Sequence, residues 1–229
     1  VFYTLSFLPS KKAPIRTLVI GNVKMGGTGK SPVTIEVLNV MQNLNQEVAF
    51  LSRGYGRRTK GFQLIQSQST PSEVGDEPLM IAQRFPKILA AVSEDRLIGI
   101  EKLAQHDSSL QCVVLDDAFQ HRWVKAGLNL VLNTYDKPLD KEALLPVGRL
   151  RESAKGVRRA DALIITKCPD FQSFDQELIR ESYQKYQLPV FFSRYTYLPL
   201  KPLTALEVSG FERVILVSAI AQPKNLAEA

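Results

Sequence analysis

The sequence predicts an α/β fold in which a mostly parallel sheet carries helices on both faces. Short apolar runs, rich in β-branched residues, recur along the chain between longer amphipathic stretches. Such runs are typical of strands that are buried on both faces, and the stretches between them can form crossover helices. Polar motifs follow the apolar runs one after another, as expected where the carboxyl ends of parallel strands form a ligand site.

The expected elements alternate in order along the chain. Strands are expected at residues 18–20, 48–51, 88–92, 112–115, 128–132, 163–165, 190–192 and 214–217. Helices are expected within the amphipathic stretches, at residues 32–44, 76–84, 95–105 and 174–187,. The long segments 57–72 and 136–157 are polar or contain proline and glycine, and we interpret them as lids or substrate loops,.

The composition is that of a globular protein with a basic surface. Apolar residues make up 45% of the chain and charged residues 23%, which is ordinary for a soluble globular protein,. The net charge of +6 favours anionic partners, namely nucleotide, nucleic acid, phosphorylated lipid or an acidic membrane surface,. Cys112 and Cys168 lie far apart in apolar runs and lack metal-ligand spacing, so we expect buried thiols,. No apolar run approaches the ~20 residues that span a bilayer.

The glycine-rich segment 21–31 is the most informative part of the chain. It lies between an apolar strand and a predicted helix, although Lys24 stands where the common P-loop pattern has its first glycine. In such a loop, backbone N–H groups bind phosphates, a lysine reaches the outer phosphates and a hydroxyl holds Mg²⁺. The segment therefore predicts a P-loop NTPase-like fold. We assign nucleotide binding to Gly26, Gly27, Thr28, Gly29, Lys30 and Ser31.

Two carboxylates follow the apolar run at residues 112–115. Asp116 and Asp117 have the form of a Walker B element, in which a carboxylate holds Mg²⁺ or its water opposite the loop hydroxyl,. Two aspartates after a strand are also common in turns and caps, but the phosphate loop in the same predicted sheet favours metal binding. Gln120 and His121 follow at the same edge, and His121 is either a structural histidine or a site residue,.

Two further motifs also follow strands. Arg53 lies at the carboxyl end of the second strand and suits an anion, whereas a solvated basic turn explains Arg57 and Arg58,. Asp76 opens a predicted helix, where it is either an N-cap or a general base that takes a proton from a substrate hydroxyl,. The residues themselves leave these two interpretations of Asp76 open.

The loop at residues 144–152 combines a Pro/Gly turn with Arg149, Arg151 and Glu152. Charged loops are usually just solvated, yet an arginine on the transferring phosphoryl group and a glutamate near Mg²⁺ would complete the predicted site. After the strand at 163–165, Thr166 and Lys167 resemble the guanine-reading Asn-Lys-x-Asp element of GTPases. Pro169 occupies the Asp position of that element, which argues against guanine.

Five motifs together resemble the tetraacyldisaccharide 4′-kinase family, the lipid A 4′-kinases of Gram-negative bacteria. They are residues 21–32 (GNVKMGGTGKSP), 51–56 (LSRGYG), 75–78 (GDEP), 116–121 (DDAFQH) and 145–152 (LPVGRLRE). Their order and spacing over most of the chain make the resemblance specific. It implies transfer of the ATP γ-phosphate, with Mg²⁺, to the 4′-hydroxyl of a tetraacyldisaccharide 1-phosphate lipid. It also implies a peripheral protein on the cytoplasmic face of the inner membrane.

The resemblance implies a role for each residue in these motifs. Lys30 would contact the β- and γ-phosphates, and Asp76 would be the catalytic base, so the resemblance favours the general base over the N-cap. The implied catalytic residues are Asp76, Lys30, Asp117, His121 and Arg151. The implied metal ligands are Ser31, Asp116 and Glu152. The residues implied to bind the anionic lipid are Arg53, Tyr55, Glu77 and Gln120.

Three differences from the family pattern shape these expectations. Ala118 replaces a usual glycine, and residues 146–152 differ from the frequent form P-A-G-P-L-R-E. The chain also ends before the Asp-His-His element that the family pairs with its catalytic aspartate. We therefore expect a fragment shortened at the C-terminus and at the N-terminus, whose capacity to complete the transfer stays open. Residues 1–205 would form the P-loop kinase core, with residues 1–8 as a remnant of the membrane-docking segment, and residues 206–229 the start of an incomplete C-terminal subdomain.

Two other classes of function serve as alternatives. A P-loop NTPase switch or metallochaperone of the GTPase-like kind would prefer GTP and depend on a partner, and Pro169 argues against it. A basic nucleic-acid-binding ATPase would interleave aromatic residues with its basic ones to stack bases, and the chain lacks that pattern. We therefore expect no nucleic-acid partner.

Overall fold

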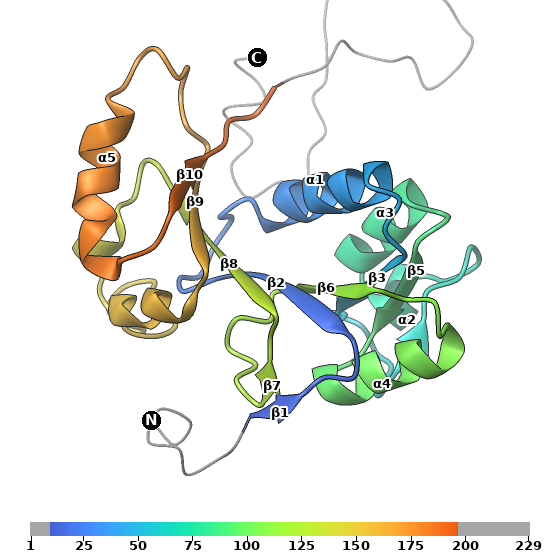
Figure 1. Ribbon diagram of the computed structural model, residues 1–229. Helices are drawn as coiled ribbons and strands as arrows, with labels where there is room; N and C mark the ends of the chain where they lie inside the picture. Colours follow the sequence, from blue (N-terminus) through green and yellow to red (C-terminus); the bar gives the residue numbers. More distant parts are fainter. Residues whose placement is uncertain (1–9, 197–229) are drawn as a thin grey trace, which may run out of the picture.

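The computed structural model describes residues 10–196, which form an eight-stranded sheet with the strand order β10-β9-β8-β2-β6-β3-β5-β4 (Figure 1). All neighbouring strands run parallel except β4, which is antiparallel to β5. The strands are β2 (Arg16–Asn22), β3 (Val48–Ser52), β4 (Gln63–Leu64), β5 (Leu89–Val92), β6 (Cys112–Asp116), β8 (Leu128–Thr134), β9 (Ala162–Thr166) and β10 (Val190–Phe192). A separate two-stranded sheet joins β1 (Lys11–Lys12) to β7 (Val124–Lys125).

The helices connect the strands of the large sheet. They are α1 (Lys30–Asn43), α2 (Pro71–Val74), α3 (Asp76–Arg84), α4 (Arg96–His106) and α5 (Gln176–Tyr183), with 3₁₀ turns η1 (Leu139–Lys141), η2 (Ala154–Arg159) and η3 (Gln184–Tyr186). Figure 1 shows α1 and α3 on one face of the sheet and α4 on the other. The predicted mostly parallel α/β fold with helices on both faces is confirmed. None of the helices in residues 10–196 is long and apolar enough to cross a bilayer.

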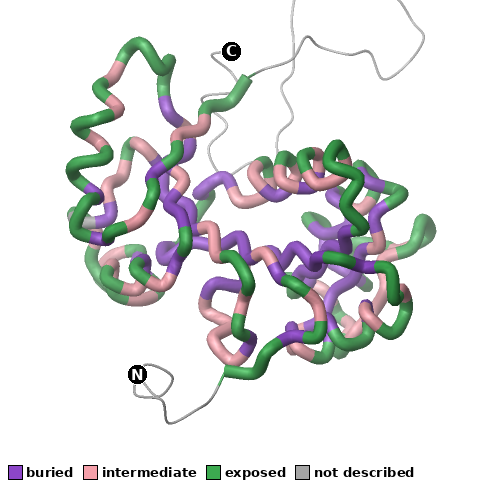
Figure 2. The backbone as a smooth tube through the Cα atoms, viewed as in Figure 1, coloured by how far each residue is buried: buried purple, intermediate pink, exposed green. Residues whose placement is uncertain are grey.

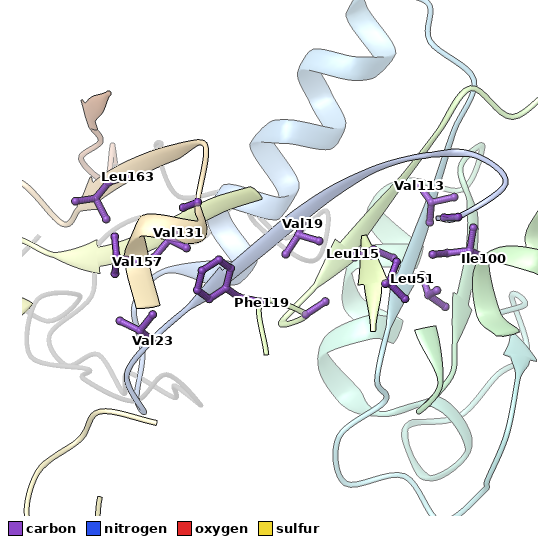
Figure 3. Close-up of a cluster of buried hydrophobic side chains, with 14 of the residues drawn as sticks. Val19, Val23, Leu51, Ile100, Val113, Leu115, Phe119, Val131, Val157 and Leu163 are labelled. Carbon is purple, nitrogen blue, oxygen red and sulfur yellow. The ribbon is translucent and has the colours of Figure 1, made fainter. Parts of the chain in front are cut away.

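The strands are buried on both faces, as their continuous apolar runs predict. Successive side chains of a strand point to opposite faces. Val19, Leu51 and Val113 therefore pack with Ile100 of α4 in one cluster, which Figure 3 shows. Their sequence neighbours pack on the opposite face with residues of α1 and α3, in the set Ile20, Phe50, Val114, Leu38 and Ile81. Figure 2 shows the buried sheet between the exposed outer sides of the helices.

The predicted elements are observed with shifted ends. Each of the predicted strands within residues 10–196 overlaps an observed strand, and the strand predicted at 214–217 lies outside the described residues. The helix predicted at 174–187 is shorter, because Asp175 caps its start and the chain tightens into the 3₁₀ turn η3 after Tyr183, which Gln187 ends with φ 58°. The predicted docking segment 1–8 and the predicted subdomain 206–229 also lie outside the described residues, so the division at residue 205 stays a prediction.

Candidate functional site

The phosphate loop lies between the end of β2 and the start of α1. Gly26 and Gly29 have φ values of 109° and 82°, in the left-handed region that glycine adopts without a steric penalty,. The Asn22 side-chain amide donates to the Thr28 hydroxyl (2.6 Å), and the Thr166 hydroxyl donates to the Thr28 carbonyl (2.8 Å). No side chain caps α1, so its first N–H groups are left for an anion,. Residues at the ends of two strands thus fix a loop that is suited to phosphate.

Asp116 lies at the carboxyl end of β6 and is 3% exposed. Its carboxylate oxygens accept hydrogen bonds from the hydroxyls of Thr34 and Ser52, each at 3.5 Å. Desolvation, reinforced by the negative charges of Glu77 and Asp117, raises the pKa of Asp116 to about 7,. The surrounding protein therefore compensates its negative charge only in part.

Asp117 brings two predicted phosphate-binding cations together. The Lys30 ammonium lies 3.6 Å from Asp117 Oδ1, and the Arg151 guanidinium donates to both Asp117 oxygens at 3.0 and 3.2 Å. Arg151 reaches this position because its N–H donates to the Val23 carbonyl (2.8 Å), which pairs the 149–151 segment with the phosphate loop. The fold thus brings together residues from three distant motifs.

The start of α3 faces the start of α1. The Ser31 hydroxyl donates a hydrogen bond to the Glu77 carboxylate, so Glu77 lies at the phosphate loop. Gly75, which has no side chain to cap the helix, occupies the N-cap position of α3, and Asp76 is the first residue of the helix. The N-cap interpretation of Asp76 is therefore wrong. The Asp76 carboxylate is exposed and accepts a hydrogen bond from the N–H of Glu77 (2.9 Å), while its role as a base stays a prediction.

Gln120 and Glu152 form a second group behind the loop. The Gln120 amide donates to the Asn22 carbonyl (2.7 Å) and to Glu152 (3.1 Å), and Arg159 pairs with Glu152 at 2.8 Å. The Glu152 carboxylate thus contacts Gln120 and Arg159. Metal ligation by Glu152 stays a prediction, and it requires the carboxylate to replace Gln120 or Arg159 with the metal ion.

The turn after β3 divides into exposed and buried residues. Arg53 is exposed, and Tyr55 is 88% exposed, so both are available to a large ligand. Arg57, in contrast, pairs with Glu94 at 2.6 Å and its side chain is 2% exposed. The expectation of a solvated basic turn is therefore wrong for Arg57, which is structural.

His121 contacts a different part of the structure from the Lys30–Asp117 pair. Its ring packs against Trp123, with centroids 4.3 Å apart, and it lines a cavity of about 280 Å³ with Phe119. Desolvation, with the positive charges of Arg96 and Arg53, lowers the pKa of His121 to about 4,. The ring is therefore neutral near pH 7, and its catalytic role stays a prediction.

The pKa shifts of Asp116 and His121 predict opposing pH dependences of stability. The raised pKa of Asp116 makes stability fall as the pH rises from about 4 to about 7, whereas the lowered pKa of His121 makes stability rise between about 4 and 6.5,. In urea unfolding without ligands, Asp116→Asn is expected to lose stability as the pH falls through this window. His121→Gln is expected to gain stability over the same window. Parallel pH profiles for the two variants would contradict these assignments.

Two buried cations at the site were missed in the sequence. Arg96 is fully buried at the start of α4 and donates to the carbonyls of Ser93 (2.5 Å) and Asp116 (3.3 Å). Its position just after β5 is the signal that could have identified it. Lys24 is 2% exposed, and its ammonium donates to the Lys137 carbonyl (2.8 Å). The lysine that breaks the common loop pattern thus ties the loop to the segment after β8.

Replacing Lys24 with methionine is expected to destabilise the protein by about 1 kcal/mol, because the part-buried Lys137 carbonyl loses the Lys24 donor and keeps only the Asn133 amide,. Urea unfolding at constant pH measures the change. Lys60→Met, at an exposed position, is the control and is expected to leave the free energy of unfolding within about 0.5 kcal/mol of its original value,. Equal stability of the two variants would show that the Lys24 contact contributes nothing.

Comparison with known proteins identifies relatives of the whole chain. Residues 1–229 match the family described as tetraacyldisaccharide-1-P 4′-kinase. The chain is 38% identical to a tetraacyldisaccharide 4′-kinase of Bacteroides thetaiotaomicron over 97% of its own length and 63% of that protein. It is 37% identical to one of Cytophaga hutchinsonii over 99% of its length and 65% of that protein. The chain spans less than two thirds of the length of these curated relatives.

A solved structure shares the fold. The crystal structure of LpxK from Aquifex aeolicus in complex with ATP matches with a TM-score of 0.65 and 27% identity, over 89% of this chain and 79% of that one. The family match spans the phosphate loop, the Asp116–Asp117 pair and the arginine loop that the fold gathers at one edge of the sheet. This chain belongs to the tetraacyldisaccharide 4′-kinase family.

Proposed function

We propose that this chain is the core of an ATP-dependent kinase that phosphorylates the 4′-hydroxyl of a tetraacyldisaccharide 1-phosphate lipid in lipid A biosynthesis. The family description names this acceptor. The observation that carries the proposal is the convergence of Lys30 and Arg151 on Asp117 beside the phosphate loop. Phosphoryl transfer depends mainly on positioned cations and metal ions, and this arrangement supplies the cations.

The nucleotide is ATP. The related LpxK of Aquifex aeolicus was crystallised in complex with ATP, which supports the same nucleotide here. The open N-terminus of α1 and the side chain of Lys30 would bind the β- and γ-phosphates,. Because both Lys30 and Arg151 contact Asp117, phosphate oxygens would compete with this carboxylate for the two cations.

The residues at the site fit Mg²⁺. The raised pKa of Asp116 reflects burial near the carboxylates of Glu77 and Asp117, and a divalent cation would offset this crowding of negative charge,. No group of three or more His, Cys, Asp or Glu side chains suited to a metal occurs within residues 10–196. Ser31 and Asp116 would therefore share Mg²⁺ with phosphate oxygens and water, as is usual for this ion. Bound Mg²⁺ would neutralise charge on the β- and γ-phosphates.

The acceptor would approach from the exposed side of α3. Asp76, exposed at the start of this helix, would take the proton of the 4′-hydroxyl,. Arg151 would stabilise the charge on the transferring phosphoryl group, and the exposed Arg53 and Tyr55 would contact the anionic sugar lipid,. The acceptor's acyl chains imply peripheral contact with the cytoplasmic face of the inner membrane of a Gram-negative bacterium.

The test is transfer of labelled γ-phosphate by the whole protein, with and without the 4′-hydroxyl disaccharide lipid in detergent micelles. We expect transfer to the lipid to require ATP, and GTP to support it poorly. Hydrolysis that is indifferent to the lipid, or that prefers GTP, would instead favour an NTPase switch.

A further inference from the structure

The turn at residues 143–147 presents a continuous apolar run to solvent. These residues, Ala-Leu-Leu-Pro-Val, are all exposed, with Leu144 50%, Leu145 47% and Val147 89% exposed. We call them the 143–147 tip. Single exposed apolar residues are common, but a run of this length on a folded surface is typical of an interaction site.

Hydrogen bonds hold the tip in one shape. The Leu145 N–H donates to the Leu150 carbonyl (2.9 Å), the Gly148 N–H to the Leu144 carbonyl (2.9 Å), and the Leu150 N–H to the Ala143 carbonyl (3.0 Å). A Cβ atom at Gly148 would overlap the Ala143 carbonyl oxygen, so only glycine allows the two sides of the turn to approach this closely. The turn therefore has a defined backbone shape, and its apolar side chains are exposed in that shape.

The tip is attached directly to the phosphate loop. The Met25 N–H donates to the Arg149 carbonyl (2.7 Å), two residues beyond the tip, and the Met25 side chain is itself 49% exposed. Arg151, four residues beyond the tip, contacts Asp117. Whatever surface the tip contacts is thus held close to the phosphate-binding residues.

The segment that carries the tip is basic. From residue 141 to residue 159 the only carboxylates are Glu142 and Glu152, and Arg159 pairs with Glu152. The cations of this segment are Lys141, Arg149, Arg151, Lys155, Arg158 and Arg159. An apolar tip between cations fits a bilayer surface with anionic lipids, because apolar insertion and attraction to the lipid charge add together.

We propose that the 143–147 tip inserts into the interface of an anionic lipid bilayer and holds the phosphate loop at the membrane surface. The inference rests on the proposed function in one respect: an acceptor with four acyl chains stays in the bilayer, so the phosphate loop must come to it,. The tip supplies apolar contact, and the flanking Lys141 and Arg149 supply the attraction to lipid charge.

Sedimentation with vesicles tests the tip without requiring catalysis. The chain is mixed with vesicles of phosphatidylcholine containing phosphatidylglycerol, and with vesicles of phosphatidylcholine alone. We expect binding to the anionic vesicles, and a decrease of about tenfold in the partition coefficient for Leu144→Ser/Val147→Ser. The matched control is Leu178→Ser/Phe191→Ser, at positions 62% and 57% exposed, which is expected to bind as the original chain does.

Equal loss of binding in both double variants, or no binding of the original chain to anionic vesicles, would overturn the proposal. A second measurement uses Val147→Cys carrying an environment-sensitive dye, with Leu178→Cys as its control, because both natural cysteines are buried. A blue shift on anionic vesicles at position 147 alone supports insertion. A blue shift without lipid that grows with protein concentration would show that the tip joins two copies instead, which also overturns it.

These outcomes are separate from those of the proposed function. ATP binding in solution without lipid is expected to be the same for the original chain and for both double variants. Loss of ATP binding in Lys30→Ala with unchanged vesicle binding would support the nucleotide site and leave the proposal for the 143–147 tip unaffected. If the chain bound vesicles through the 143–147 tip but did not bind ATP, the result would support membrane insertion of the tip and contradict the proposed kinase function.

Discussion

Lys30→Ala is expected to lower the rate of phosphoryl transfer by about 10³-fold or more and to weaken ATP binding. Lys30 is the first residue of α1, and its ammonium lies 3.6 Å from Asp117 with a side chain that is 15% exposed. A phosphate bound at the start of this helix would lose its nearest mobile cation, which a neutral methyl group cannot replace. Single-turnover transfer to the lipid measures the rate, and titration with a fluorescent ATP analogue measures binding.

Lys60→Ala is the matched control, because Lys60 is exposed in the loop before β4 and is expected to leave the rate unchanged. Arg151→Ala extends the experiment. Since Lys30 and Arg151 contact the same carboxylate, their effects are expected to be non-additive in a double-mutant cycle,. Wild-type rates in Lys30→Ala, or strict additivity with Arg151→Ala, would show that these residues do not act as one phosphate-binding unit.

The strands of the large sheet could be predicted because each is buried on both faces and reads as an apolar run. The strands β1, β4 and β7 were not predicted, because each has two residues, which are too few to show the alternation of apolar and polar residues that marks a strand,. The end of β6 could also be predicted, because the apolar run of this strand gives way to acidic residues where the strand ends. The edge of the sheet that holds the site therefore followed from the sequence.

The partners of the site residues could not be predicted. Glu77 follows Asp76 in sequence, yet it accepts a hydrogen bond from Ser31 because α1 and α3 cover the same face of the sheet. Arg57 resembles any arginine of a basic turn, and only the fold brings Glu94 beside it. The position of Arg96 after β5 marks it as a candidate, but its burial against the carbonyls of Ser93 and Asp116 depends on the fold. Each of these contacts depends on packing between segments that are distant in sequence or on backbone geometry.

Asp76→Asn is expected to lower kcat by roughly 10²–10⁴-fold while ATP affinity and stability stay nearly constant. The reason is positional. Asp76 is the exposed first residue of α3, and its carboxylate accepts a hydrogen bond from the Glu77 N–H. Asparagine keeps an acceptor for that N–H but cannot take a proton from a hydroxyl, so the change separates base catalysis from helix stability.

Asp95→Ala provides the contrast, because Asp95 is a true N-cap. Its carboxylate accepts hydrogen bonds from the N–H groups of Leu97 (2.9 Å) and Ile98 (3.2 Å) at the start of α4. This variant is expected to lose about 1 kcal/mol of stability and to keep the kcat of its folded fraction. If Asp76→Asn behaved in the same way, with reduced stability and an unchanged kcat, Asp76 would be structural and the proton of the 4′-hydroxyl would have to go elsewhere. A kcat loss in Asp76→Asn alone would assign the proton transfer to Asp76, because both carboxylates accept hydrogen bonds from N–H groups at a helix start and that shared contact cannot explain a difference in kcat.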